Sequence, residues 1–191
     1  MSPAPNKGMI TTTKAIPAEV VARIKEHLAD KPRELCYFTL AINSALRGGD
    51  ILSIKRIELE QLPDGRLELL TRERKTHKLR GIVFNHAVAQ AVNNWLAVHP
   101  RRTDYLFDGM HGKMGTGYWS WLMKKWCREC GWDEPRIATY SARKTFVIEN
   151  YKRGASLATL MHALNHDSER TTLAYMGILG EDVQKLYDTT I

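Results

Sequence analysis

The spacing of apolar residues changes character once along this chain, and this change limits the folds open to it. Helical spacing predominates on both sides of a short region that runs from Ile57 to Phe84. Within that region Leu62-Pro63-Asp64-Gly65 forms a turn signature between apolar stretches, and residues 79–84 have a strand-like pattern. The sequence therefore predicts an α+β fold that is mainly helical, with one small antiparallel sheet.

The helical segments expected from apolar spacing are distributed over most of the chain. The second of them should end at Gly48-Gly49, which would place Arg47 at a helix terminus. The second turn of the sheet should be the basic segment 72–78. We expect helices over 18–28, 33–47, 86–98, 117–130, 141–152, 156–164 and 168–176.

Length and composition indicate a single soluble globular domain. The chain has 191 residues, 43% of them hydrophobic and 26% charged, which is ordinary for a globular protein. Residues 1–14 carry no apolar periodicity and should form a flexible lead-in to a folded domain over 15–191. No apolar run approaches the roughly 20 residues that span a bilayer, so we expect no membrane association and a cytoplasmic protein.

The net charge of +7 favours a polyanionic partner, because each phosphate neutralised by Lys or Arg releases condensed counterions. The cysteines form no disulfide framework, and the Cys127-x-x-Cys130 pair lacks a second pair at zinc-ligand spacing. Both cysteines should pack on one amphipathic helix. The tryptophans are likewise expected to be core or helix-packing residues: Trp95, Trp119, Trp121, Trp126 and Trp132.

The last third of the chain carries the residues with the clearest chemical meaning. Two short helical patterns between 156 and 176 are broken at 165–167, which is typical of a helix-turn-helix and makes a DNA-binding regulator a competing interpretation. The same region contains Tyr140-Ser141-Ala142-Arg143, then Leu164-Asn165-His166, then Thr172-Leu173-Ala174-Tyr175. His166 follows Arg143 by 23 residues, and Tyr175 follows His166 by nine.

These residues resemble the tyrosine recombinase (phage integrase) family, in which an arginine opens a helix, a histidine follows in an L-G-H context and a tyrosine in a T-x-x-Y context. The resemblance extends upstream, since Ala45 to Leu52 is similar to the G-L-R-x-x-E-L-L box that carries the family's first catalytic arginine. That places Arg47 at the arginine and Asp50 at a supporting acidic residue. The basic turn resembles the hairpin of the catalytic lysine, with Lys75 the first candidate and Lys78 the second.

The resemblance implies strand cleavage and rejoining through a 3′-phosphotyrosine on Tyr175, without metal or nucleotide cofactor. Two guanidiniums can clamp the non-bridging phosphate oxygens, His166 can donate a further hydrogen bond, and Lys75 can protonate the leaving 5′-oxygen. Two positions depart from the family pattern. Tyr140 replaces the usual histidine, and its phenol is a poor base at neutral pH. Lys144 replaces a second histidine, where a cation can still reach phosphate.

The family also implies partners and an assembly. Double-stranded DNA is the expected substrate, with a homotetramer on paired sites and a location on the nucleoid. The segment 181–191 has apolar spacing that suits either docking on a neighbouring protomer or folding back on its own domain. Family members commonly carry a DNA-clamping domain before the first arginine box, whereas 46 residues precede Arg47 here, which leaves open a fragment or a short member.

Two other functions compete with a site-specific recombinase. A non-catalytic DNA-binding regulator would account for the helix pair and the basic charge, and a relaxing topoisomerase of the type IB kind shares the tyrosine chemistry. The combined set of Arg47, Lys75, Arg143, His166 and Tyr175 argues against the regulator. The integrase-like contexts of these residues argue against the topoisomerase.

Overall fold

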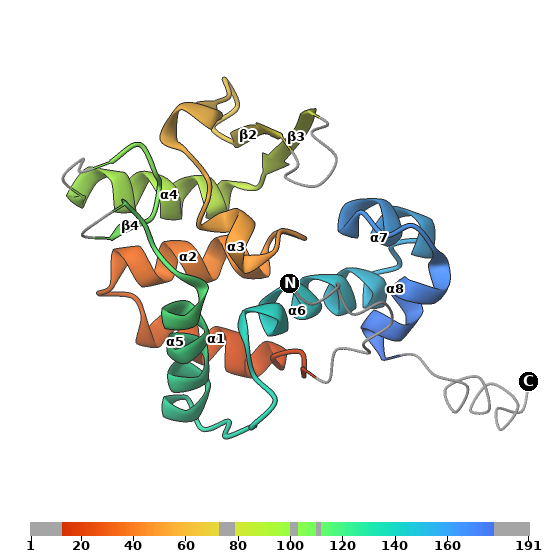
Figure 1. The fold of residues 1–191 in the computed structure, drawn as a ribbon. Helices are drawn as coiled ribbons and strands as arrows, with labels where there is room; N and C mark the ends of the chain where they lie inside the picture. The colour runs from red at the N-terminus through yellow and green to blue at the C-terminus, as the bar shows by residue number, and fades with distance from the viewer. Residues whose placement is uncertain (1–12, 73–78, 100–102, 110–111, 178–191) are drawn as a thin grey trace, which may run out of the picture.

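A computed structural model of the chain describes residues 13–72, 79–99, 103–109 and 112–177. Short helices surround a central one, α6, and a small sheet lies at one edge (Figure 1). The helices are α1 (Ala18–His27), α2 (Pro32–Ile42), α3 (Gly48–Ile51), α4 (His86–Val98), α5 (Thr116–Glu129), α6 (Thr139–Lys152), α7 (Leu157–Leu164) and α8 (Glu169–Met176), with a 3-10 turn η1 (Arg56–Glu58). These elements confirm the expected α+β class.

The main hydrophobic core lies among α1, α2, α4 and α5, on one side of α6 (Figure 1). Its centre is aromatic: the Tyr37 and Trp119 rings stack with centroids 3.9 Å apart, and Phe107 meets both edge-on. Trp126 of α5 meets the rings of Trp119 and of Phe38 on α2 edge-on, which extends this aromatic group. Large aromatic side chains bury much apolar area, so this group is a major source of the stability of the domain.

A second, smaller core lies on the other side of α6, where α7 and α8 pack (Figure 1). Val147 of α6 faces this core, and Leu160 and Leu164 of α7 are buried against it. Tyr175 and Met176 enter it from α8. Helix α6 therefore belongs to both cores and fixes the α7–α8 pair relative to the rest of the chain.

The sheet has the predicted meander topology. Strands β1 (Leu59–Gln61), β2 (Leu67–Arg72) and β3 (Leu79–Phe84) are antiparallel in the order β1-β2-β3, with Leu67 paired to Phe84 at the base of the β2–β3 hairpin. One face packs on the core through Leu67, Leu69 and Phe84. The predicted basic turn lies at 73–78, outside the described residues, as do the lead-in over 1–12 and the segment 181–191.

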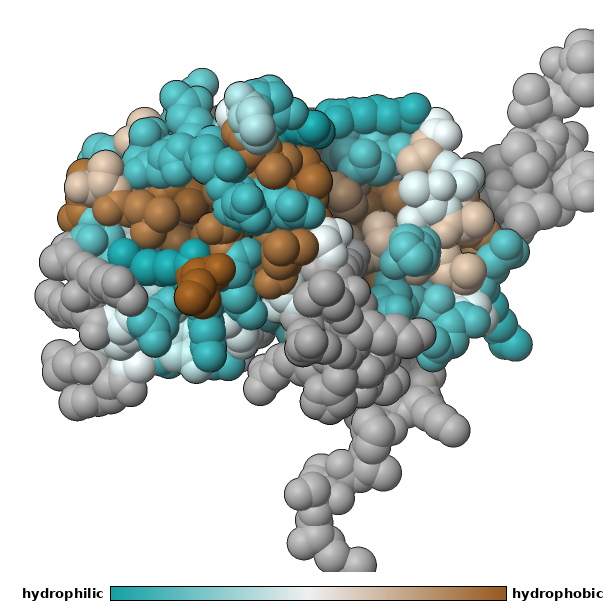
Figure 2. Space-filling view, turned by 90° about the horizontal axis from the view of Figure 1, so that it is seen from above, coloured by the Kyte–Doolittle hydropathy of each residue, from teal (hydrophilic) through white to brown (hydrophobic). Residues whose placement is uncertain are grey.

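The surface seen from above mixes polar and apolar residues, with apolar ones gathered on the part at the left of the view (Figure 2). The exposed large apolar side chains include Leu70 and Val83 of the sheet, which lie on the face opposite Leu69. A half-buried antiparallel sheet alternates in this way. Among the described residues, no helix is both long and apolar enough to cross a membrane.

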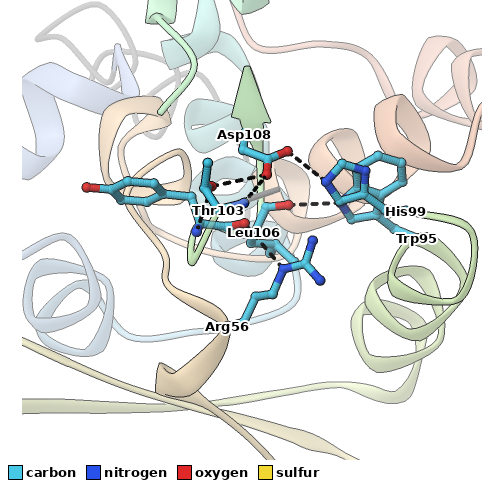
Figure 3. Close-up of polar contacts among 7 residues, drawn as sticks. Arg56, Trp95, His99, Thr103, Leu106 and Asp108 are labelled. Atoms are coloured by element: carbon cyan, nitrogen blue, oxygen red, sulfur yellow. Dashed lines mark hydrogen bonds and ion pairs between the residues drawn. The ribbon is translucent and has the colours of Figure 1, made fainter. Parts of the chain in front are cut away.

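A polar cluster fastens the loop after α4 to the segment that follows α3 (Figure 3). Asp108 is buried and accepts hydrogen bonds from the backbone and hydroxyl of Thr103, and its Oδ1 lies 2.7 Å from His99 Nε2. Burial opposes ionisation of Asp108, but the Thr103 and His99 hydrogen bonds outweigh it and lower the pKa of the carboxyl. Arg56 Nε donates to the Tyr105 carbonyl at 3.4 Å, which links this cluster to η1. A small β4 (Asp108–Gly109) and β5 (Gly112–Lys113) pair follows.

The expected helix over 33–47 was wrong at its C-terminal end. Helix α2 stops at Ile42, and Gly48-Gly49 begin α3 instead of ending the previous helix. The side chains of Asn43 and Ser44 cause the early end, because they donate back to the carbonyls of Thr39 and Leu40 at 2.9 and 2.8 Å. Such side-chain bonds compete with continuation of the helix. Arg47 consequently lies at a helix N-terminus, as the N-cap of α3.

The other helices agree with their predicted ranges to within about two residues at most ends. The tryptophan prediction was correct for Trp95, Trp119 and Trp126, which are buried, and for Trp132, which packs against the main core. It was wrong for Trp121, which is 55% exposed. Cys127 and Cys130 are both buried as expected, and burial raises the pKa of the Cys127 thiol to about 12.

Candidate active site

Arg47 stands at the start of α3, where the chain is extended just before the helix turns. Its side chain is about half exposed, and Nη1 lies 4.0 Å from Oδ2 of Asp50 in the first turn of α3. At this distance and exposure the ion pair adds little stability. The arrangement instead leaves a cation near the surface, with the Asp50 carboxylate beside it.

Helix α6 is unusual because most of the polar side chains in its first half are buried. Ser141, Arg143, Lys144 and Thr145 are all nearly inaccessible. Each makes a specific hydrogen bond, as buried polar groups must. Ser141 Oγ accepts from the Ala138 amide at 3.2 Å, and Thr145 Oγ1 accepts from the Ile16 amide at 2.7 Å. The helix start is therefore fixed by polar contacts as well as by packing.

Arg143 is the buried cation of this site, with 4% of its surface exposed. Its Nη2 donates to the Leu164 carbonyl at 2.7 Å, which ties α6 to the end of α7. Its Nε makes no hydrogen bond among the described residues. Burial lowers the pKa of the guanidinium to about 10, while Tyr175 opposes and Arg47 adds to the shift, so Arg143 remains charged at neutral pH.

His166 follows the αL residue Asn165, which ends α7 with φ 53°. Asparagine is among the few side chains that adopt this conformation at low cost, and it substitutes for the glycine of the L-G-H pattern. His166 Nδ1 lies 3.0 Å from Thr172 Oγ1. Burial, reinforced by Arg143 and Arg47, lowers the pKa of the imidazole to about 4, so the ring is neutral at neutral pH.

Tyr175 projects from α8 into the same place. Its ring meets His166 edge-on with centroids 5.5 Å apart, and the Arg143 Cζ lies 5.9 Å from its ring centroid. The side chain is buried, and its hydroxyl makes no hydrogen bond among the described residues. Burial raises the pKa of the phenol to about 12, although Arg143 pulls it down. The hydroxyl is thus protonated at neutral pH, and the ring that carries it lies near the Arg143 guanidinium.

The structure brings together Arg47, Arg143, His166 and Tyr175, residues that are up to 128 positions apart in the sequence. Charges on Arg47 and Arg143 both act on the pKa values of His166 and Tyr175, which requires proximity. Tyr140 also belongs to the cluster, since it affects the pKa of Arg143 and of Tyr175, and it is 42% exposed. Lys75 and Lys78 lie outside the described residues, so their predicted placement is untested.

Lys144 lies apart from this cluster in its contacts. Its Nζ donates to the Thr13 carbonyl at 3.2 Å, and burial, followed by the charge of Lys14, lowers its pKa. A Cβ added at Gly177 would lie 3.8 Å from this amine, so Lys144 also borders the end of α8. The side chain is only 8% exposed and joins the N-terminal segment to α6. The predicted DNA contact of Lys144 stays a prediction, and in the free protein its amine is bound to the Thr13 carbonyl.

Three groups that contact the site residues or the start of α6 had no role predicted from the sequence: the Leu164 carbonyl, Thr172 and Gly48. The carbonyl has no signature in the sequence. Thr172 has one, because it precedes Tyr175 by three residues and so shares the buried face of α8. For Gly48 the sequence indicates less than for Thr172, since it shows only a glycine directly after Arg47.

Comparison with known proteins places this fold among the tyrosine recombinases. The solved structure of the XerA recombinase superposes with a TM-score of 0.75 at 16% identity, over 97% of this chain and 66% of that one. A lambda integrase dimer bound to a core site gives 0.65 at 15% identity, over 89% and 61%. At such identities these likenesses show the fold.

Sequence relatives narrow the class. The probable integrase/recombinase YoeC of Bacillus subtilis is 28% identical over 88% of this chain and 91% of its own length. Tyrosine recombinase XerC of Actinobacillus pleuropneumoniae is 25% identical over 92% of this chain, which spans 58% of that protein. Residues 14–179 match the phage integrase family, and the chain belongs to that family. The resemblance inferred from Arg47, Arg143, His166 and Tyr175 is confirmed at the level of the family.

Proposed function

We propose that this chain cleaves and rejoins double-stranded DNA through a 3′-phosphotyrosine formed on Tyr175. The observation that supports this most strongly is the environment of Arg143. A buried guanidinium normally has an anionic partner. No carboxylate lies within ion-pair distance of Arg143 among the described residues, its Nε makes no hydrogen bond there, and its Cζ lies 5.9 Å from the centroid of the Tyr175 ring. A DNA phosphate supplies the missing anion.

In this proposal the scissile phosphate lies between Arg143, Arg47 and His166. The non-bridging oxygens gain negative charge as the five-coordinate transition state forms, and two guanidiniums stabilise that charge bidentately. Arg143 acts from a buried, fixed position. Arg47 acts from the surface at the start of α3, oriented by Asp50. The neutral imidazole of His166 donates a hydrogen bond to an oxygen of the same phosphate.

The covalent step exchanges one phosphoester for another. The Tyr175 oxygen forms a bond to phosphorus and releases its proton to solvent, while the bond from phosphorus to the 5′-oxygen breaks. The leaving 5′-oxygen takes a proton from Lys75, which solvent restores, so the net proton change is zero. Reversal by a different 5′-hydroxyl rejoins the strand. Side chains supply all of the charge stabilisation in this scheme.

Tyr140 receives a minor role. Its phenol occupies the position where the family has a histidine and lies near Arg143 and Tyr175. We assign it a hydrogen bond near the phosphate and leave proton transfer to Lys75.

Double-stranded DNA is the proposed partner, supported by the net charge of +7 and by similarity to proteins solved on DNA, such as XerH bound to its difH substrate. Exchange between two duplexes cuts four strands, and one tyrosine is used for each. We therefore propose a homotetramer on paired sites, acting on the nucleoid. Mass measurement of the complex on paired and single sites tests this, since a mass no greater on paired sites would exclude it.

The covalent chemistry is tested with nicked suicide duplexes, in which the short cleaved fragment diffuses away and prevents rejoining. The substrates would be selected from a library by binding to this chain. We expect a denaturant-stable adduct to DNA labelled on its 5′ side of the break, a mapped peptide with the nucleotide on Tyr175, and unchanged yield in chelator. An adduct through a 5′-phosphate, or on another residue, would contradict the proposal.

A further inference from the structure

The His166 ring is held through one nitrogen by a residue that plays no part in the scheme above. Nδ1 lies 3.0 Å from Oγ1 of Thr172, whose side chain has no exposed surface. Thr172 is on α8, three residues before Tyr175, so both share the face that packs toward α6 and α7. One helix thus carries the proposed nucleophile and a partner of the proposed phosphate-binding histidine.

This contact matters because a neutral imidazole has one donor nitrogen and one acceptor nitrogen, and the bond at one fixes the role of the other. With the pKa of His166 lowered to about 4 by burial and by Arg143, the doubly protonated ring is not the species present at neutral pH. Two tautomers remain. Only the tautomer with its proton on Nε2 can use that nitrogen to donate to a phosphate oxygen.

The Thr172 hydroxyl has a single proton and two acceptors within reach. His166 Nδ1 is at 3.0 Å, and the Ser168 carbonyl is at 3.4 Å. That carbonyl also accepts from the Thr172 amide at 3.3 Å. The hydroxyl proton is therefore better placed toward His166 Nδ1, which is closer and does not already accept from the Thr172 amide. Hydrogen bonds weaken as the distance between donor and acceptor grows.

We propose that Thr172 is a positioning residue that donates its hydroxyl proton to His166 Nδ1, holding the imidazole in the tautomer with hydrogen on Nε2. The Nε2–H then donates to the scissile phosphate. The proposal deepens the function proposed above and rests on it for the role of Nε2. The tautomer itself is a property of the free protein.

The test in the free protein is nitrogen NMR at neutral pH with 15N-labelled histidine, assigned by difference with His166→Asn. Protonated and unprotonated ring nitrogens have well-separated shifts, so the tautomer is read directly. We expect the Nε2–H tautomer in the wild type and in Thr172→Ser, which keeps the hydroxyl. Thr172→Val has nearly the same shape without the hydroxyl and should show a detectable Nδ1–H population. Thr171→Val, at the exposed neighbouring threonine, should resemble the wild type.

Single-turnover cleavage supplies the second readout. Thr172→Val should lose about 10-fold in rate with DNA affinity unchanged, and Thr172→Ser should recover most of it. A wild-type ring with hydrogen on Nδ1, or a Thr172→Val ring whose tautomer is unchanged, overturns the proposal. Failure of the wild type to form any DNA adduct would instead defeat the proposed function, and the tautomer result would stand alone.

Discussion

Gly48, the residue after Arg47, lies so close to Thr139 that a Cβ added to it would be 2.9 Å from the Thr139 Cβ. The same atom would lie 3.0 Å from the buried hydroxyl of Tyr37. Thr139 is the first residue of α6, four residues before Arg143. The segments carrying the two arginines therefore meet in direct contact, and the absence of a side chain at Gly48 sets their separation.

This contact predicts that Gly48→Ala lowers single-turnover cleavage by about 10- to 100-fold, because overpacking by one methyl typically costs about 1–3 kcal/mol or shifts the backbone. Gly49→Ala is the matched control. A Cβ there meets only Thr116, at an ordinary 3.6 Å, and alanine is a better helix former than glycine. Equal rates for the two variants would show that Gly48 does not set the separation.

The second prediction compares Tyr140 with Arg143. Tyr140→Phe removes a hydrogen bond from a partly exposed phenol and should cost about 10- to 100-fold in cleavage rate. Arg143→Ala removes a buried charge from the transition state and should cost about 10²–10³ or more. Both rates are measured in single turnover on suicide substrate. Equal losses would make Tyr140 an acid or base in its own right.

The third prediction concerns Lys75, whose role rests on the sequence. Lys75→Ala should cleave ordinary DNA poorly but recover on a 5′-bridging phosphorothiolate, because a thiolate leaves without protonation. Lys78→Ala on the same two substrates is the control. If Lys78→Ala recovered cleavage on the phosphorothiolate and Lys75→Ala did not, Lys78 would be the residue that protonates the leaving 5′-oxygen.

The fourth prediction is a pH dependence of stability. The pKa of His166 is about 4 in the folded chain, and that of an unfolded histidine is about 6.5. Between these values the unfolded state binds more protons, so this residue lowers stability as the pH falls from about 6.5 to about 4 and has no such effect above that window. Urea unfolding of His166→Asn should show a smaller loss over this window than the wild type.

His162→Asn, at an exposed position of α7, serves as the control for that measurement and should follow the wild type. A wild-type loss that persists unchanged in His166→Asn would show that the acid sensitivity over this window comes from other groups.

Much of the fold follows from the sequence because apolar spacing reports buried faces directly. Helix α4 was predicted with its observed ends, and the meander followed from one turn signature and a strand-like run. The end of α2 was not predictable from apolar spacing, because polar side chains at Asn43 and Ser44 decide it. The wrong prediction for Trp121 could have been avoided from the helical spacing, because residue 121 lies off the buried face of α5. That face is formed by Trp119, Leu122, Met123, Trp126 and Cys127.

The candidate site was predictable as a set of residues but not as a geometry. The order and spacing of Arg143, His166 and Tyr175 carried the resemblance to the tyrosine recombinases, and the family match confirms the family, while the roles of these residues stay predictions. The sequence does not reveal that Arg143 donates to the Leu164 carbonyl or that Lys144 donates to the Thr13 carbonyl. Both hydrogen bonds depend on how α6 packs between the two cores.

The central claim, that Tyr175 is the nucleophile, is tested most directly by Tyr175→Phe on nicked suicide duplexes. Tyr151→Phe, which removes the hydroxyl of an exposed tyrosine on α6, is the matched control. We predict that Tyr175→Phe forms no denaturant-stable adduct while binding DNA with nearly wild-type affinity, since no phosphate-neutralising charge is lost, and that Tyr151→Phe forms the adduct normally. An adduct formed by Tyr175→Phe at the wild-type rate would contradict the account.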